Sequence, residues 1–259
     1  MTAQTAQTAA NPRPPLRAWT ALIGAETRSV VRDTAGLLIP LGMPLLILVM
    51  NGVTNRGGGE INGHSVFEVY VVPLVLTIVV ATIGVINMPS FLATYRRYKI
   101  LRRLAVTPAH PAMILVAQVA VSIMQTLLGV AIGLSVAMIA FDVGLPERPW
   151  TALGVFALAA FAMYAVGMLV AAIAPTANAA VAIGLTLFFA LGATGGMFGP
   201  TDAMPEPLAA VGEALPFGAA VQAIGAAWVG FDQEPAHLIA LGAAIVVSGA
   251  VAVKWFRWD

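Results

Sequence analysis

The side chains best suited to chemistry are few and scattered along this sequence. The chain has no cysteine, which excludes a disulfide framework and a thiolate metal site. Its three histidines, His64, His110 and His237, never pair at i, i+4 with a carboxylate between them, so a metal site is not predicted. No Ser/His/Asp constellation lies in the long apolar segments either, which argues against a hydrolase within them.

A phosphate-binding loop is also missing. The chain contains no GxxxxGK[ST] pattern, and the glycine-rich stretch 192–199 lies in an apolar run with no lysine after it. We therefore expect no enzyme activity from this chain, and any ATP it depends on to be hydrolysed elsewhere. The glycines that we expect to permit close helix packing instead are Gly192, Gly195, Gly196, Gly199, Gly129 and Gly133.

The most distinctive chemical pattern is a basic segment between Tyr95 and Pro111. Ile100, Leu101 and Leu104 form an apolar edge at helical spacing, and Pro108, after Thr107, ends the predicted helix. The cations that flank this edge are Arg96, Arg97, Lys99, Arg102 and Arg103. A basic flank that stops translocation of a membrane segment would account for the cations, but not for the apolar edge followed by Thr-Pro.

The composition indicates what kind of secondary structure and environment hold these residues in place. Charged residues make up 10% of the 259 residues and apolar ones 59%, against about 25% and 45–50% in soluble domains. Such a chain has too few charges to form a polar shell in water. We predict an all-α membrane protein, with a disordered tail at 1–15 and a single transmembrane domain at 16–259. Arginine outnumbers lysine eleven to two, a bias that suggests a GC-rich bacterial genome.

A membrane-crossing helix needs roughly 20 apolar residues, and six segments qualify. They lie at about 35–54, 69–92, 112–140, 151–174, 178–198 and 236–254. Pro40 and Pro44 predict a kink in the first, and the third is long enough to tilt. Between the fifth and sixth, prolines at 200, 205, 207 and 216 break an outer segment into short helices.

The distribution of charge predicts the orientation. With six spans and both termini in the cytoplasm, eleven lysines and arginines lie inside and two, Arg56 and Arg148, lie outside. Nine acidic residues fall outside in the same arrangement. An odd number of spans would divide the basic clusters between both sides. We therefore expect a multi-pass protein of the bacterial plasma (inner) membrane.

Residues 16–33 are predicted to form an amphipathic helix at the membrane surface. Leu16, Trp19, Ile23 and Val30 share one side at 100° per residue, and Arg17, Arg28 and Arg32 share the other. Two acids, Glu26 and Asp33, intrude on the apolar side. They are either the edge of an anchoring helix or the partners of a basic group on the next loop or on another protein.

The spans contain no ionisable residue at mid-depth, which argues against a proton-coupled transporter. Neutral polar residues recur with helical spacing on the third and fifth spans. They are Gln118, Ser122 and Gln125, and then Asn178, Thr186 and Thr194. Two interpretations remain open: helix–helix contact, or the wall of a substrate path or subunit interface.

The basic segment resembles the loop between the second and third spans in permease subunits of ABC-2-type exporters. The matching motifs are Leu101-Arg102-Arg103-Leu104 and Thr107-Pro108. Glu26 and Arg32-Asp33 before a proline-containing first span, and Met204-Pro205 and Leu215-Pro216 in the outer segment, are similar to the family as well. This chain has Arg97 and Lys99 where family members often carry an acid and a glycine, so its loop is expected to match one particular partner.

The resemblance implies a specific function. The loop would be the coupling helix that docks on a separate ABC ATPase subunit, residues 16–33 would be the connecting helix, and ATP-Mg would bind to that subunit. The chain would form half of a dimeric export path, with an identical or a paralogous second half, for an amphiphilic drug, natural product or lipid-like molecule. The alternatives are a polysaccharide or lipid-linked glycan exporter, and a membrane scaffold or assembly factor without transport. No nucleic-acid partner is expected.

Overall fold

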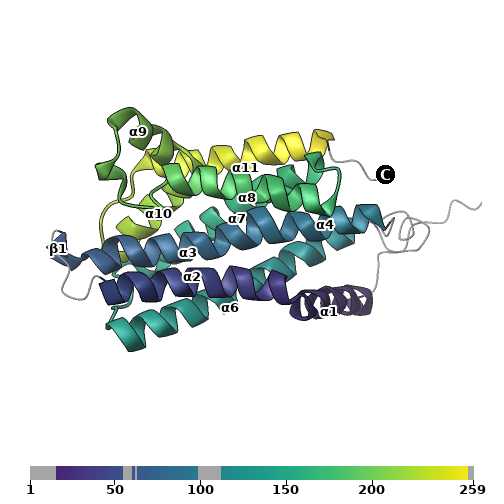
Figure 1. Cartoon of the computed structure of the whole chain (residues 1–259), viewed down its shortest axis with the longest axis horizontal. Coiled ribbons are helices and arrows are strands. Elements are labelled where there is room, and N and C mark those ends of the chain that lie inside the picture. The colour runs from purple at the N-terminus through teal and green to yellow at the C-terminus, as the bar shows by residue number, and fades with distance from the viewer. Residues whose placement is uncertain (1–15, 55–59, 62, 99–111, 256–259) are drawn as a thin grey trace, which may run out of the picture.

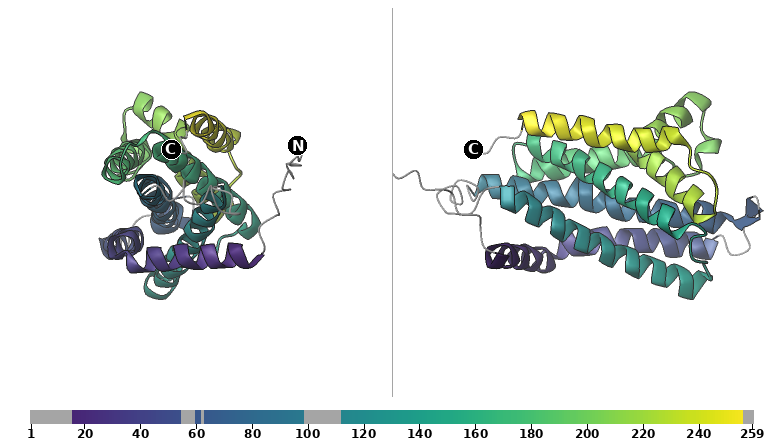
Figure 2. Two further views of the ribbon diagram at one scale, coloured as in Figure 1. Left: turned by 90° about the vertical axis from the view of Figure 1, so that its right-hand side faces the viewer. Right: turned by 180° about the vertical axis from the view of Figure 1, so that it is seen from behind.

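The structure of the protein is a computed structural model that describes residues 16–54, 60, 61, 63–98 and 112–255. Predictions for residues 1–15 and 99–111 lie outside the described residues. In the described part, long helices run side by side, and one helix lies across one end of the bundle (Figure 1, Figure 2).

Six helical stretches of the described chain are long and apolar enough to cross a membrane, as the sequence predicted. They are α2 (Thr34–Thr54), the composite helix Phe67–Arg97, α6 (Ala112–Phe141), α7 (Pro149–Ile173), α8 (Ala177–Thr194) and α11 (Pro235–Trp255). The second extends to Arg97, beyond the predicted residue 92. The fifth ends at Thr194, before the predicted residue 198, because the chain turns at Gly196 with φ +94°.

The composite helix is the centre of the bundle. It consists of η1 (Phe67–Val71), α3 (Val72–Ala81), η2 (Thr82–Asn87) and α4 (Met88–Arg97), and η1 and η2 are π-helical turns. Every residue from Val71 to Val85 is buried, as expected for a helix that is apolar on all sides. α2, α7, α8 and α10 pack around it. π-helical turns are uncommon and concentrate at functional sites. η2 is therefore a candidate for part of a functional site.

The predicted surface helix is confirmed as α1 (Leu16–Arg32), which lies across one end of the bundle in Figure 2. Val30 is buried, whereas Arg17, Arg28 and Arg32 are exposed. Arg96, Arg97 and Lys254 lie at the ends of helices at this same end, which we call the basic end. The opposite end, called the acidic end, carries Glu68, Asp142, Glu147, Glu206, Glu213, Asp232 and Glu234.

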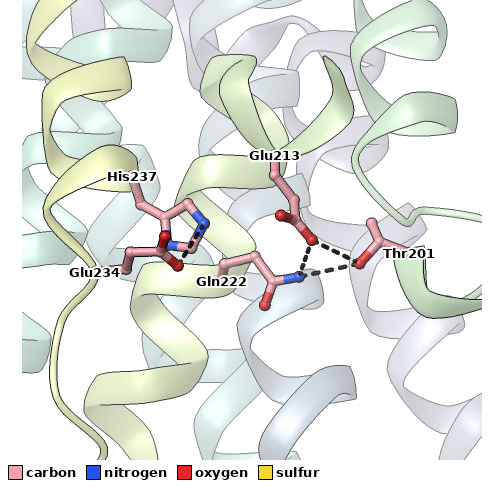
Figure 3. A network of polar contacts seen from close by, with 5 residues as sticks. All are labelled: Thr201, Glu213, Gln222, Glu234 and His237. Carbon is pink, nitrogen blue, oxygen red and sulfur yellow. Dashed lines mark hydrogen bonds and ion pairs between the residues drawn. The ribbon is translucent and has the colours of Figure 1, made fainter. Parts of the chain in front are cut away.

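At the acidic end, the predicted broken helices are confirmed. After η3 (Thr201–Ala203), α9 (Glu206–Ala214) and α10 (Pro216–Trp228) meet at an angle of 84°. Gln222 Nε2 donates to Thr201 Oγ1 at 3.1 Å, and Thr201 Oγ1 donates to Glu213 Oε1 at 3.3 Å, which ties the three short helices together (Figure 3). A two-stranded ribbon, β1 (Glu60–Ile61) and β2 (His64–Ser65), extends beyond the bundle.

The glycines predicted to permit close packing divide into two groups. A Cβ at Gly195 would lie 2.7 Å from the amide nitrogen of Gly218, and one at Gly129 would lie 2.8 Å from a methyl group of Val79, so both need to be glycine. A Cβ at Gly192 would lie 2.8 Å from the sulfur of Met197, and Gly196 has a positive φ in the turn that ends α8. For Gly133 and Gly199 the prediction is wrong, because a Cβ at either would meet no atom within 4 Å.

Candidate functional site

Two of the residues assigned to ATPase coupling are described, Arg96 and Arg97 at the end of α4. The others lie outside the described residues and are Lys99, Ile100, Leu101, Arg102, Arg103, Leu104, Thr107 and Pro108. What the structure defines is therefore the part of the bundle from which this segment departs. At that point α4 is attached to its neighbours on two sides.

The first attachment joins α4 to α1 through Glu26. Glu26 is 6% exposed, and its carboxylate accepts a hydrogen bond from the Tyr95 hydroxyl. Helical spacing put Glu26 on the apolar side of α1, and its burial there confirms that position. The contact that it makes is with a phenol, where the sequence had suggested a basic group as one of two alternatives.

The second attachment joins α4 to the turn between α7 and α8 through Arg96. Its guanidinium donates to the backbone carbonyls of Ala172, at 3.4 Å, and Ala174. The last carbonyls of a helix have no partner within the helix and carry partial negative charge, so a cation there satisfies and stabilises the end. We call these two attachments, through Tyr95 and Arg96, the α4 anchor.

Asp33 has a local role at the start of α2. Its Oδ1 accepts a hydrogen bond from the amide of Gly36 at 3.1 Å, which is the geometry of an N-cap. Arg32, beside it, is exposed. The contact shown for Asp33 is thus with the helix that it begins. It fixes the junction between α1 and α2.

Gln125 is the centre of a buried hydrogen-bonded cluster at the junction of three helices. Its Nε2 donates to the Gly36 carbonyl at 2.6 Å, and Asn87 Nδ2 donates to that same carbonyl at 2.9 Å and to Gln125 Oε1 at 3.1 Å. Asn87 is the last residue of the π-helical turn η2. Polar groups in an apolar interior are stable only when paired in this way.

Two further residues on the same face of α6 are buried. Gln118 and Ser122 are 2% and 1% exposed, and Gln118 Oε1 has no hydrogen-bond partner in the described part of the chain. One turn further along, Thr126 bonds to the Tyr164 hydroxyl at 2.7 Å. Asn87, Thr126 and Tyr164 were not singled out from the sequence; the signal was a polar side chain within an otherwise apolar span.

The polar residues of α8 have the opposite position. Asn178 and Thr186 are exposed, Thr194 is half-buried, and Thr186 and Thr194 bond back to the carbonyl of Ala182 at 2.9 Å and of Ala190 at 3.0 Å. The two sets of predicted residues are therefore not brought together. The α6 set lies inside the bundle, and the α8 set lies on its outside.

A small hollow lies between α2, the composite helix and α8. It has a volume of about 150 Å³, and Gly36, Thr82, Asn87, Ser90 and Val181 are among the residues that line it. Beside it, α2 exposes a row of large apolar side chains, namely Leu38, Ile39, Leu46 and Met50. The outside of the bundle thus has an apolar strip on α2 and a mixed strip on α8, where Leu185 and Phe189 are exposed beside Asn178 and Thr186, and both helices contact η2.

The described residues include no group of three or more His, Asp or Glu side chains that could hold a metal ion. In comparison with known families, residues 17–227 match the family described as ABC-2 type transporter. This match covers most of the chain and agrees with the six spans and the broken outer helices. The chain belongs to the ABC-2 type transporters and is the transmembrane subunit of one. The comparison with curated proteins found no match.

Membership of this family defines what the chain lacks as well. Permease subunits of this kind do not carry the ATPase domain, which lies on a separate subunit, and they typically pair with that ATP-binding subunit. The α4 anchor lies at the start of segment 96–108, which the sequence assigns to this pairing.

The Glu26–Tyr95 pair gives a testable difference in stability. Tyr95→Phe removes the hydroxyl that donates to the buried carboxylate, at a cost of about 1–3 kcal/mol. We expect the melting temperature of the purified chain in detergent to fall. Tyr98→Phe is the matched control, because Tyr98 follows the last residue of the same helix and is 61% exposed, and it should melt like the wild type. Equal melting of the two variants would contradict a structural role for the pair.

The buried Glu26 carboxyl should also make the stability of the folded chain depend on pH. Burial raises the pKa of Glu26 above its ordinary value of 4.5, and the hydrogen bond from Tyr95 acts in the opposite direction. The folded form then holds a proton that the unfolded chain releases above about pH 4.5, so stability falls as the pH rises from there towards the raised pKa. Glu26→Gln, which keeps an acceptor for Tyr95, should remove this part of the pH dependence.

Proposed function

We propose that this subunit is half of a dimeric, ATP-driven exporter of an amphiphilic molecule, a drug, a natural product or a lipid-like compound. The observation that carries the proposal is the outer face formed by α2 and α8. The apolar strip of α2 and the mixed strip of α8 lie on either side of the end of η2, and the polar residues of the α8 strip are Asn178, Thr186 and Thr194. A molecule with a polar and an apolar part matches such a face, and a second copy or a paralogue would close it into a path.

The source of energy follows from the charges of the spans. The buried polar residues in the described part of the six spans are all neutral, among them Thr82, Asn87, Gln118 and Gln125. A proton- or cation-coupled path commonly uses an ionisable residue there. Energy is therefore expected from ATP-Mg on the partner subunit, delivered through segment 96–108 to α4. The α4 anchor would pass this movement to α1 on one side and to the α7–α8 turn on the other.

The basic end is the cytoplasmic end in this proposal, since lysine and arginine accumulate on the cytoplasmic side of membrane proteins. α1 would then lie on the inner membrane surface, with both chain ends inside the cell. The broken helices α9 and α10 would face the exterior. The nucleotide-binding subunit would approach from the side of α1 and segment 96–108.

Transport in vesicles tests the proposal. The chain and its ATP-binding subunit are reconstituted together, and a short-chain fluorescent phospholipid and an amphiphilic dye serve as probes. We expect probe movement to require ATP on the side from which a cysteine at Ser29, exposed on α1, can be labelled. An uncoupler that dissipates the proton gradient should leave movement intact. Movement that an uncoupler abolishes at constant ATP, or that needs ATP on the other side, would contradict the proposal.

A further inference from the structure

A second hollow lies on another face of the bundle, between α6, α7 and α11. It is a groove of about 500 Å³, within the 300–1,000 Å³ range of ligand pockets. The side chains that line it include Val119, Phe161, Met168, Ile245 and Val253, together with Gly249. Its one hydroxyl, that of Tyr164, is already bonded to Thr126. The groove therefore suits a hydrocarbon chain.

The groove has the depth of one membrane leaflet. On α7, Met168 and Phe161 are five and twelve residues before the last residue, Ile173, or about 8 and 18 Å at 1.5 Å per residue. On α11, Ile245 is ten residues before Trp255, or about 15 Å. Half of the hydrocarbon core of a bilayer is also about 15 Å.

A basic pocket lies one helical turn beyond the groove, at the basic end. It has a volume of about 460 Å³ and is lined by Arg96, Arg97, residues 172–175 and Trp255. Ala172 follows Met168 by four residues on α7, and Trp255 follows Ala252 by three on α11, so the pocket continues the line of the groove. Among the residues that the structure describes, no carboxylate lines either hollow. Trp255 is 56% exposed, as is typical of tryptophan at a membrane surface.

We infer that the groove and the basic pocket together form a binding site for one anionic phospholipid. The acyl chain lies between α6, α7 and α11, and the phosphate lies beside Arg97 and Arg96. Arg97 is exposed, while Arg96 adds its charge as it holds the Ala172 and Ala174 carbonyls. Basic pockets between membrane helices near the cytoplasmic surface bind anionic headgroups in this way. The site shares no lining residue with the α2–α8 face and does not depend on the proposed transport.

Photo-crosslinking tests the site. The full chain is placed in lipid nanodiscs with a phosphatidylglycerol that carries a diazirine in its acyl chain. We expect adducts on residues 161–168 and 245–253. Unlabelled phosphatidylglycerol should compete better than phosphatidylcholine, and Arg97→Gln should reduce this preference about fivefold, the effect of one cation near an anionic lipid.

A pair of glycine variants provides the control. A Cβ at Gly249 or at Gly242 would meet no atom within 4 Å, so both positions have room for the first atom of a side chain. Gly249→Leu fills the groove and should abolish the adducts, whereas Gly242→Leu, on the same helix outside the groove, should not. Adducts that survive Gly249→Leu, or that spread equally over the exposed faces of α2 and α8, would overturn the inference.

Discussion

Gly167→Ala is expected to destabilise the bundle severely, although it adds only one methyl group. A Cβ at Gly167 would overlap the backbone carbonyl of Gly84 in the π-helical turn η2. Because the obstacle is backbone, α7 and the composite helix would have to move apart. Overpacking in a core typically costs about 1–3 kcal/mol, and more when backbone must shift. We expect loss of most of the folded chain, measured as the monodisperse fraction after heating in detergent.

Gly154→Ala is the matched control on the same helix. A Cβ at Gly154 would meet nothing within 4 Å, and alanine favours a helix over glycine by about 1 kcal/mol. The two substitutions are chemically identical and should act in opposite directions. If Gly167→Ala melted at or above the wild-type temperature, the close contact between α7 and η2 would not exist in the folded protein.

The same π-helical turn is approached from α8 as well. A Cβ at Gly184 would overlap the carbonyl of Val85, one residue after Gly84. Two spans thus meet the centre of the bundle at successive carbonyls, each through a glycine. Asn87, at the end of this turn, bonds to Gln125 and to the Gly36 carbonyl. At η2 four other spans, α2, α6, α7 and α8, are therefore fixed to the composite helix, and a movement of α4 would reach all of them there.

The sequence predicted the elements of this fold well, because hydrophobic length and helical spacing are local properties. All six spans, α1 and the broken outer helices could be obtained in that way. Pairing through space could not: nothing in the spacing of Gly84 and Gly167 indicates that they meet. The sequence also did not show which polar side chains face the interior. Gln118 and Thr186 both stand among apolar residues in the sequence, but Gln118 is buried inside the bundle and Thr186 is exposed on its outside.

The candidate site was predictable only in part for a related reason. Helical spacing put Glu26 on the buried side of α1, but its partner Tyr95 is 69 residues away. In the sequence, Arg96 is one of several neighbouring cations that cannot be told apart by their spacing. In the structure it caps the end of α7 while Arg97 beside it is exposed. A charged run in a sequence thus does not show which cation is structural and which remains available.

Leu104→Asp is expected to separate this subunit from its ATPase. Leu104 lies outside the described residues, and in the sequence it belongs to the apolar edge with Ile100 and Leu101. Burying one such side chain against a soluble partner contributes roughly 1.5–3 kcal/mol, and an exposed ion pair at the rim contributes about 0–1 kcal/mol. Leu104→Asp should therefore weaken the complex at least about tenfold, the equivalent of 1.4 kcal/mol, and more than Arg103→Ala does.

The measurement is co-purification with the ATP-binding subunit, followed by ATPase activity with and without a transported probe. Leu104→Met, which keeps volume and apolar character, is the control and should behave as the wild type. All variants must first accumulate in the membrane at the wild-type level, so that a failure to insert is not mistaken for a failure to dock. The α4 anchor gives a second comparison, since Tyr95→Phe should leave docking intact but weaken the response of hydrolysis to the probe. If Leu104→Asp retained both binding and stimulated hydrolysis, segment 96–108 would be a basic flank of the second span, and the ATPase would have to dock elsewhere.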